Sequence, residues 1–416
     1  MIVPASDHFG SVKPKIQQDQ MHKSESSDVQ KQNLPVIAVF LPMYGIASEI
    51  WVKRQAEAFA RSEPVLLTWE THHSKFWKFP KKHICMSLPW TSDGFGYRIS
   101  RNFKLFRCLY RLRECKTVRD HLSQQNASIA ICHFGWTASR VYTVLRDLKI
   151  PYFIICHGLD LATPALVKSY LTDLKSSIKN AAGVVIVGSH MKNAINQLHP
   201  TIDKNKIHQI PCGAPIKSFS RNRPSRRQKD EPLKLISVGR LFEGKGIDLS
   251  ISAISQLIKS GLDLHFTIVG EGVELSHLSK LSETLGIEQH VTFCGKLQQV
   301  DIAKLLKSNH VFLQPSRKSK SGWIEGFGVS ITEAMASGLP VIATLSGGIP
   351  DQVRDQRDGF LVEEEDYKGI AEAILTYYTS EETRFRHSQN AQKQATNFDS
   401  AKLAQKLEGL LLQEIA

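Results

Sequence analysis

The 416-residue sequence lacks any run of about 18 consecutive apolar residues, the length that a membrane-spanning helix requires. Its first 34 residues contain no apolar core of about 7–15 residues, so we expect no secretory signal there. The seven cysteines form no CxxC pair, and most lie inside apolar runs, as Cys132 and Cys156 do. These features predict a cytosolic protein with reduced, buried thiols and argue against a secreted, membrane-spanning or zinc-ribbon protein.

Positive charge is concentrated in one half of the chain. Residues 35–213 carry 24 basic and 11 acidic residues, whereas residues 214–416 carry 25 of each and residues 1–34 carry four of each. The whole net charge of +13 therefore belongs to the first half. Such asymmetry indicates an anionic partner for that half, and on charge alone nucleic acid and an acidic membrane surface both qualify.

The densest basic run extends from Arg98 to Arg119. On a helix, one face would be apolar and the other basic, with Ile99, Phe103, Phe106 and Tyr110 on the first and Arg101, Lys104, Arg107 and Arg111 on the second. This pattern is typical of a helix that lies on an anionic membrane, and also of an ordinary surface helix that packs on its own domain. No nucleic-acid-binding signature accompanies the charge, so we expect no nucleic acid partner.

Short apolar runs alternate with helical patterns after residue 34. The runs are rich in β-branched residues, as expected of parallel strands buried on both faces. They cover residues 35–42, 64–69, 128–132, 151–156, 183–188, 233–239, 264–270, 290–295, 310–316 and 339–344. Helices are predicted at about 47–61, 98–124, 137–148, 164–180, 190–198, 247–260, 274–285, 299–307, 330–337, 350–355, 366–379 and 398–414. The alternation predicts an α/β protein with parallel sheets.

The composition divides the chain further. Residues 1–34 are polar and aperiodic, which predicts a disordered tail. We expect a Rossmann-like domain at 35–214, a basic linker at 215–232, a second Rossmann-like domain at 233–398 and a C-terminal helix at 399–416 that packs back on the first domain. In doubly wound sheets, ligands bind beyond the carboxyl ends of the strands, so the loops after the strands are the expected location of the chemistry.

The segment VGRLFEGKG (238–246) directly follows a predicted strand. Arg240 and Lys245 lie five residues apart on this loop, and its glycines allow backbone conformations that other residues avoid. Two cations on such a loop can form a diphosphate clamp. A surface turn with two solvated cations is the alternative.

A second segment, EGFGVSITEAMASGLP (325–340), combines a glycine turn with a short helix that opens near Ser330. The amino end of a helix favours a phosphate because its N–H groups are unpaired. Glu333 fits a capping box with Ser330, which is a purely structural alternative for that carboxylate. Glu325 has no comparable local role.

Two further residues follow predicted strands. His157 of HGLD follows PYFIIC, although a histidine in a loop is more often structural. Gly45 follows the first strand and would let the backbone approach a ligand.

Together these motifs resemble the family 4 glycosyltransferases, retaining enzymes of the GT-B fold, over about residues 36–400. The most specific feature is Glu325-x7-Glu333, supported by VGRLFEGKG and IVGEG in the same order and spacing. The pieces SEIWVKRQAEAFAR (48–61), HFG (133–135) and HGLD are similar to the colanic-acid-type exopolysaccharide branch. The resemblance implies two doubly wound domains facing each other across a cleft.

The resemblance also implies a role for each matching residue. Arg240 and Lys245 would hold the donor diphosphate, Glu333 the ribose hydroxyls, and Glu325 the hydroxyls of the transferred sugar. The remaining implied contacts are the amides of Phe327, Gly328 and Val329 on the diphosphate and sugar, His157 beside the reacting sugar, Gly45 at the phosphates, and Gly295, Lys296 and Leu297 at the base.

The chain departs from the family pattern at two places. Tyr44 precedes Gly45 where many relatives carry paired glycines, and Asp351 stands where glutamate is common.

The resemblance predicts a hexosyltransferase that uses a nucleotide-sugar donor, such as a UDP-sugar, with no metal and no further cofactor. Its acceptor would be a lipid-linked glycan of a surface polysaccharide, and the enzyme would be peripheral on the inner face of the plasma membrane. Two alternatives remain open: a transferase with a soluble acceptor, and a non-catalytic nucleotide-sugar-binding protein.

Overall fold

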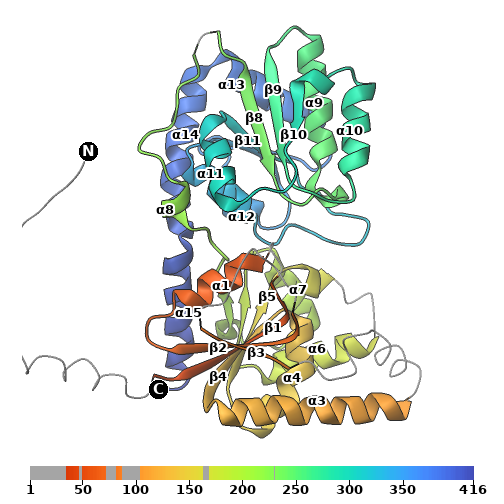
Figure 1. The fold of residues 1–416 in the computed structure, drawn as a ribbon, viewed down its shortest axis with the longest axis vertical. Coiled ribbons are helices and arrows are strands. Elements are labelled where there is room, and N and C mark those ends of the chain that lie inside the picture. Colours follow the sequence, from red (N-terminus) through yellow and green to blue (C-terminus); the bar gives the residue numbers. More distant parts are fainter. Residues whose placement is uncertain (1–33, 46–48, 72–80, 87–103, 163–167, 229) are drawn as a thin grey trace, which may run out of the picture. The chain divides into compact units, whose positions relative to one another are not determined.

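Two parallel β-sheets organise the chain (Figure 1). The computed structural model describes residues 34–45, 49–71, 81–86, 104–162, 168–228 and 230–416, without the side chains of 71, 104–110, 168 and 169. The predicted tail at 1–33 lies outside these residues. Both sheets belong to one unit that begins at Pro35.

The first sheet has the order β3-β2-β1-β4-β5-β6-β7. Its strands are β1 (Val36–Tyr44), β2 (Glu63–Thr71), β3 (Lys82–Cys85), β4 (Ala127–His133), β5 (Tyr152–Cys156), β6 (Gly183–Ile186) and β7 (Ile207–Gln209). The helices of this half are α1 (Ile50–Glu57), α3 (Lys104–Gln124), α4 (Gly135–Asp147), α5 (Leu159–Ala162), α6 (Lys168–Asn180) and α7 (Met191–Leu198). The short helix α8 (Ile216–Phe219) follows and packs against the second half.

The second sheet has the order β10-β9-β8-β11-β12-β13. Its strands are β8 (Leu233–Val238), β9 (Leu264–Val269), β10 (Val291–Phe293), β11 (Val311–Gln314), β12 (Val341–Thr344) and β13 (Gly359–Val362). The helices that follow α8 are α9 (Ile247–Lys259), α10 (Leu275–Thr284), α11 (Gln299–Ser308), α12 (Val329–Ala336), α13 (Tyr367–Thr379), α14 (Glu381–Ala395) and α15 (Ser400–Gln413).

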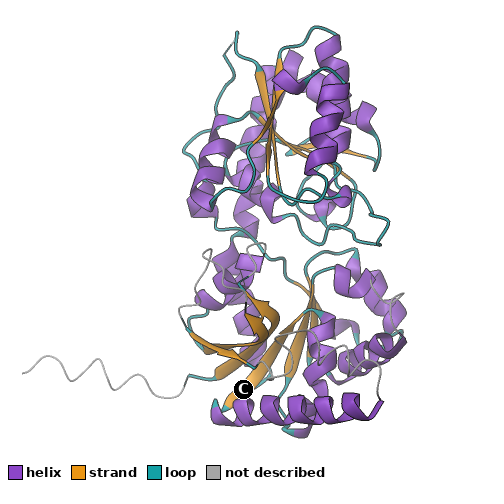
Figure 2. Cartoon of the chain, turned by 45° about the vertical axis from the view of Figure 1, so that its right-hand side comes forward, coloured by secondary structure: helices purple, strands orange, loops and turns teal. Residues whose placement is uncertain are grey.

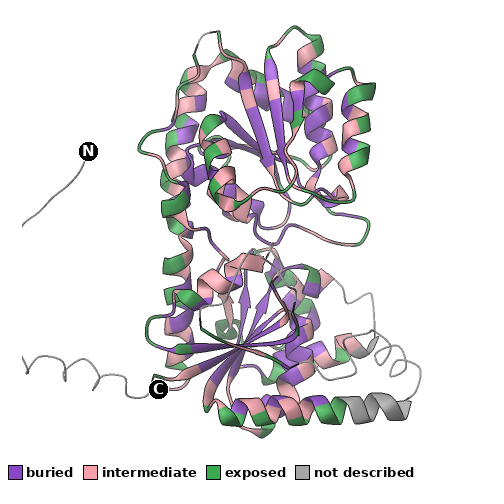
Figure 3. Cartoon of the chain, in the orientation of Figure 1, coloured by how far each residue is buried: buried purple, intermediate pink, exposed green. Residues whose placement is uncertain are grey.

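Helices cover both faces of each sheet (Figure 2). The central strands lie between these helices and are drawn mostly as buried in Figure 3, whereas the edge strands β3, β7, β10 and β13 are only partly buried. In β1, for example, Ile37, Phe40 and Leu41 are each 0 % exposed. This burial explains why the strands read as continuous apolar runs rather than as alternating patterns.

The strand order reverses between β1 and β4 in the first sheet and between β8 and β11 in the second. These are the positions at which doubly wound sheets bind ligands. The loops after β8 and β11 carry Arg240, Lys245 and Glu325, so the topology places the predicted residues where ligand binding is expected.

The last helix, α15, packs against α1 of the first half (Figure 1). Its side chains Leu407 and Leu411, both 0 % exposed, join the core of the first sheet. The buried carboxylate of Glu408 accepts hydrogen bonds from the backbone N–H groups of Ala60 and Arg61 and from the hydroxyl of Ser62, at 3.1, 2.8 and 2.5 Å.

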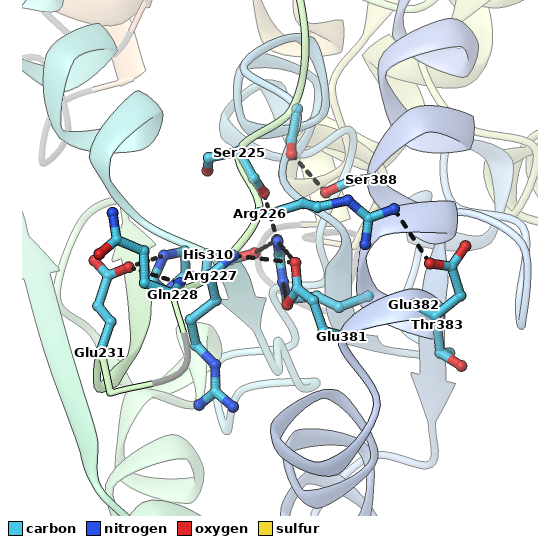
Figure 4. A network of polar contacts seen from close by, with 12 residues as sticks. Ser225, Arg226, Arg227, Gln228, Glu231, His310, Glu381, Glu382, Thr383 and Ser388 are labelled. Carbon is cyan, nitrogen blue, oxygen red and sulfur yellow. Dashed lines mark hydrogen bonds and ion pairs between the residues drawn. The ribbon is translucent and has the colours of Figure 1, made fainter.

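The segment predicted as a linker is bound along its length to the second half. Phe219 of α8 is fully buried, and the backbone N–H of Arg227 donates to Glu381 at 3.0 Å. The buried guanidinium of Arg384 on α14 bonds to Glu381 and to the carbonyl oxygens of Ser225 and His310 (Figure 4). A polar sequence therefore does not mean a loose segment here.

The observed elements differ from the sequence predictions in one wrong helix and in several elements that were missed. The helix predicted at 350–355 is wrong, because only a short 3₁₀ turn at Ile349–Asp351 forms. The sequence missed α14 and the edge strands β3, β7 and β13. Residues 98–103 of the predicted basic helix lie outside the described part, in which α3 begins at Lys104.

Among the described residues, no helix combines the length and apolar character needed to cross a membrane.

Candidate active site

Lys245 and Glu325 meet where the ends of β8 and β11 lie side by side. The Nζ atom of Lys245 donates to Oε2 of Glu325 at 2.6 Å, and the two side chains are only 12 % and 7 % exposed. The residues are 80 positions apart in the sequence, and the parallel pairing of β8 with β11 brings their loops together. A lysine ammonium has three N–H donors, so Lys245 can keep this bond and still bind an anion.

A polar network orients Glu325 further. Its Oε2 also accepts from the side-chain amide of Gln314, at the end of β11, at 2.7 Å and from the hydroxyl of Ser316 at 3.2 Å. Gln314 in turn accepts from the hydroxyl of Ser330 on α12 at 2.9 Å. Buried carboxylates are stable as anions only when paired and hydrogen-bonded, and Glu325 meets both conditions.

The loop that carries Lys245 is held tightly in place. Gly246 has φ +63°, and a Cβ there would lie 1.9 Å from the carbonyl oxygen of Pro315, so no other residue fits. The backbone N–H of Arg317 donates to the carbonyl of Gly244 at 2.9 Å, and its guanidinium bonds to Asp248 at 3.0 Å. The glycines of this loop thus permit close contact with the loop after β11.

Arg240 lies on the same loop and is exposed. Its guanidinium carbon lies 5.2 Å from the ring centroid of Phe242. Its positive charge also acts on Glu49, the residue that precedes α1. Burial raises the pKa of Glu49 to about 7, and Arg240 opposes that rise.

The glycine turn of EGFG touches the HGLD loop through the backbone. A Cβ on Gly326 would lie 2.2 Å from the carbonyl oxygen of His157, and a Cβ on Gly188 would lie 2.6 Å from the carbonyl oxygen of Gly326. A Cβ on Gly348 would likewise lie 2.2 Å from the oxygen of Gly326. These loops therefore pack at a distance that side chains would prevent.

The ring of His157 is enclosed by aromatic residues. Its centroid lies 4.3 Å from that of Trp51 and 4.6 Å from that of Phe134. Its Nε2 lies 3.3 Å from Nδ1 of His133, and its Nδ1 lies 3.8 Å from Sγ of Cys212. Burial, together with His133, holds the pKa of His157 well below its usual value, so the ring is neutral. The backbone oxygen of His157 faces the EGFG turn at Gly326.

The capping box considered for Glu333 does not form. The helix α12 begins at Val329 with Gly328 before it, and no side chain caps its amino end. Oε1 of Glu333 instead lies 3.7 Å from Nη1 of Arg54 on α1. Burial raises the pKa of Glu333 to about 7, and Arg54 opposes the rise.

The residues just before α12 contribute in different ways. The ring of Phe327, 7 % exposed, packs 5.6 Å from that of Phe398, and Val329 packs on the same core. The carbonyl of Gly328 accepts from the N–H of Ile331 at 2.9 Å. With its side-chain amide oriented to satisfy its neighbours, Gln352 also bonds to the N–H and the carbonyl of Gly328, each at 3.0 Å.

Gly295 is linked to the loop that carries Arg240. Its carbonyl accepts from the N–H of Gly270 at 2.9 Å, and a Cβ on Gly270 would lie 1.8 Å from the carbonyl oxygen of Gly239. Lys296 is exposed, and Leu297 packs on a core cluster of the second half.

Gly45, the predicted residue after β1, is buried and has φ +90°. The residues that follow it, 46–48, lie outside the described part.

Asp351, one of the two departures from the family pattern, joins the two halves. Its carboxylate accepts from the backbone N–H and the hydroxyl of Ser189 at 2.6 and 2.7 Å. It also accepts from the side chain of Gln209 on β7 at 3.0 Å.

The sequence did not identify four residues of the site. Glu49, Trp51 and Arg54 lie in a segment quoted only for its resemblance, and Gln314 lies inside a predicted strand. Their position after β1 or at the end of β11 was the available signal.

Comparison with known proteins matches the part of the chain that carries most of these residues to a family. Residues 218–394 match the family model described as "Glycosyl transferases group 1". This part of the chain is a group 1 glycosyltransferase domain. It contains Arg240, Lys245, Glu325 and Glu333.

Two curated relatives extend the similarity beyond the group 1 domain. The chain is 29 % identical over 254 residues to the protein named colanic acid biosynthesis glycosyltransferase WcaL of Escherichia coli, covering 60 % of this chain and 61 % of WcaL. It is 27 % identical over 252 residues to the amylovoran biosynthesis glycosyltransferase AmsK of Erwinia amylovora, with the same coverage. The chain thus spans about 61 % of the length of these relatives.

Solved structures establish the fold around the group 1 domain. HepE of Anabaena, solved in complex with UDP, superposes with a TM-score of 0.73 at 16 % identity, covering 91 % of this chain and all of that one. The lipopolysaccharide outer core galactosyltransferase WaaB gives 0.69 at 17 %, covering 91 % and 99 %. The chain therefore has the GT-B fold.

Proposed function

We propose that the protein is a retaining hexosyltransferase that moves a sugar from a nucleotide diphosphate to a glycan acceptor. The observation that carries the proposal is the Lys245–Glu325 pair at the end of β8 and β11, beside the exposed Arg240. The cations would bind the diphosphate and Glu325 the hydroxyls of the sugar. The names of WcaL and AmsK support a role in exopolysaccharide synthesis.

The chemistry follows from where charge develops. When the bond between the sugar C1 and the phosphate oxygen breaks, negative charge grows on the departing nucleoside diphosphate. Arg240, Lys245 and the amino end of α12 would stabilise that charge more in the transition state than in the ground state. The acceptor hydroxyl would attack C1 from the face that the leaving group vacates and would pass its proton to the leaving phosphate. In this scheme no protein nucleophile and no metal ion are needed.

We propose a UDP-sugar as the donor, because HepE was solved with UDP and with UDP-glucose. A thermal-shift screen against UDP, GDP, ADP and their sugars tests this choice. A ligand at about 100 times its Kd should stabilise the fold by about 2.7 kcal/mol. Stabilisation by GDP but not UDP would change the donor, and stabilisation by none of them would overturn the proposal. Unchanged sugar transfer in excess EDTA would support the metal-free scheme.

We also propose a lipid-linked acceptor at a membrane surface, with α3 as the membrane contact. In the described part of α3, Arg111 pairs with Asp173 and Arg119 with Asp147. Leu112, which is 61 % exposed, lies beside the exposed Arg113 on this helix. Flotation with anionic liposomes at low and high salt tests the contact. Absence of salt-sensitive binding would favour a soluble acceptor instead.

A further inference from the structure

Arg54 and Glu333 form a pair of opposite charges between α1 and α12. Their side chains are 13 % and 12 % exposed, and Nη1 and Oε1 are 3.7 Å apart. A pair this buried contributes little to stability, because the loss of hydration offsets the attraction. Its placement beside the proposed donor site requires another explanation.

The surroundings leave Arg54 as the charge that acts on Glu333. On the elements packed against α12, Lys217 of α8 is exposed and Arg384 of α14 is bonded to Glu381. On α1, Lys53 pairs with Glu57 at 3.6 Å. Among the described residues, only Arg54 favours the anionic form of Glu333.

Ribose recognition depends on the ionisation of this carboxylate. An ionised carboxylate is an acceptor only and can take hydrogen bonds from two neighbouring hydroxyls at once. Such charge-assisted bonds are roughly twice as strong as neutral ones. In a protonated Glu333, one oxygen carries the proton and acts as a donor. The side chain would then lose much of its preference for a nucleotide that has ribose hydroxyls.

We propose that Arg54 is a positioning residue for the nucleotide: its guanidinium, 3.7 Å from the carboxylate of Glu333, favours the ionised carboxylate and holds it for the ribose hydroxyls. This inference rests on the proposed function, in which Glu333 binds the ribose. It assigns to the first half of the chain a part in recognising the donor. Arg54 itself need not touch the nucleotide.

The test measures ribose selectivity as a function of pH. Calorimetric titration of the wild-type chain with UDP, GDP and ADP first identifies the nucleotide that binds. The Kd of that nucleotide is then compared with the Kd of its 2′,3′-dideoxy form between about pH 6 and pH 9. We expect the wild type to prefer the ribose form about tenfold at high pH. The preference should fall as the pH drops through about 7, where Glu333 becomes protonated.

Arg54→Met should lose this preference at pH 7 and regain it as the pH approaches 9, because Glu333 then ionises without help. Lys53→Met, one position earlier on α1, is the matched control and should behave as the wild type. A preference in Arg54→Met that equals the wild type at every pH overturns the inference. If high pH does not restore the preference for the ribose form in Arg54→Met, the inference is also overturned. In that case Arg54 would support the local structure without affecting the ionisation of Glu333.

A second pair of variants covers the case in which Arg54→Met does not fold. Glu333→Gln and the double variant Arg54→Met/Glu333→Gln leave no unpaired anion in the buried site. The two should bind the nucleotide equally, because Arg54 acts through Glu333. A further loss in the double variant overturns the inference. A wild-type chain that binds no nucleoside diphosphate overturns the proposed function as well, whereas intact binding with unchanged selectivity overturns this inference alone.

Discussion

The Nζ atom of Lys245 lies 2.6 Å from Oε2 of Glu325, so a cation expected to hold phosphate and a carboxylate expected to hold sugar are bonded to each other. The two groups cannot be adjusted independently, since each fixes the position of the other. A donor bound here would have its diphosphate and its sugar placed by one connected set of side chains.

Removing either cation of the proposed clamp should slow the transfer of sugar. We expect Lys245→Met and Arg240→Ala each to lower kcat by about 10²–10³-fold, the usual effect of losing one group that stabilises charge in the transition state. Steady-state kinetics with a nucleotide-sugar donor measures the effect. Lys304→Met, on a lysine that is 73 % exposed, is the control and should leave kcat unchanged. Wild-type kcat in both clamp variants would contradict the clamp.

Glu49 should make stability depend on pH. Its pKa in the folded chain is about 7 against an ordinary value of 4.5, so its favourable protonated state is lost as the pH rises through 7. Glu49→Gln should therefore stabilise the protein by about 1–3 kcal/mol at pH 8 and by much less at pH 5. Urea denaturation at the two pH values measures this. Glu57→Gln, at the end of α1, is the control and should change stability little at either pH. An equal gain in stability for Glu49→Gln at both pH values would refute the explanation.

Alanine substitutions at two glycines of the site should have very different effects on stability. Gly326→Ala would place a Cβ 2.2 Å from the carbonyl oxygen of His157, a backbone atom that cannot move freely. We expect a loss of about 2 kcal/mol or more in the free energy of unfolding. Gly239→Ala meets only the flexible Lys245 side chain at 3.6 Å and should unfold at nearly the wild-type temperature. Equal melting temperatures for the two variants would contradict the close packing of these loops.

Asp351 should contribute to stability through its three hydrogen bonds to Ser189 and Gln209. Asp351→Ala is expected to lower the free energy of unfolding by about 1–2 kcal/mol, because charge-assisted bonds at a partly exposed site each contribute modestly. Asp301→Ala, which breaks a surface ion pair with Lys304, is the control and should cost under about 0.5 kcal/mol. If Asp351→Ala lowers the free energy of unfolding no more than the control does, these hydrogen bonds contribute little to stability.

The sequence predicted the buried strands of both sheets because each is a continuous apolar run, but it missed the edge strands β3, β7 and β13. The sequence also assigned Arg240, Lys245 and Glu325 to loops that follow strands, and these residues lie after β8 and β11, because the loop after a parallel strand has a fixed place at the sheet edge. The pairing of Arg54 with Glu333 could not be predicted in this way. It joins residues far apart in the sequence, and their local spacing carries no signal for it.

The helix α14 shows a different limit. Its inward side chains include Arg384, His387 and Ser388, which are buried and hydrogen-bonded. A helix whose inner face is polar has no apolar periodicity to detect. For the same reason the sequence carried no sign that the predicted linker at 215–232 contacts this helix, because polar residues that bind a helix cannot be told from solvent-exposed ones by their pattern.

The core of the first sheet contains Leu407 and Leu411, which belong to the final helix, α15. During synthesis, amino-terminal regions generally fold first. Here the first sheet cannot complete its apolar interior until the ribosome has made the second sheet and the helix α15 after it. Until then the surface that α15 will cover stays open to solvent, so the first sheet acquires its complete core only after the second sheet has been synthesised.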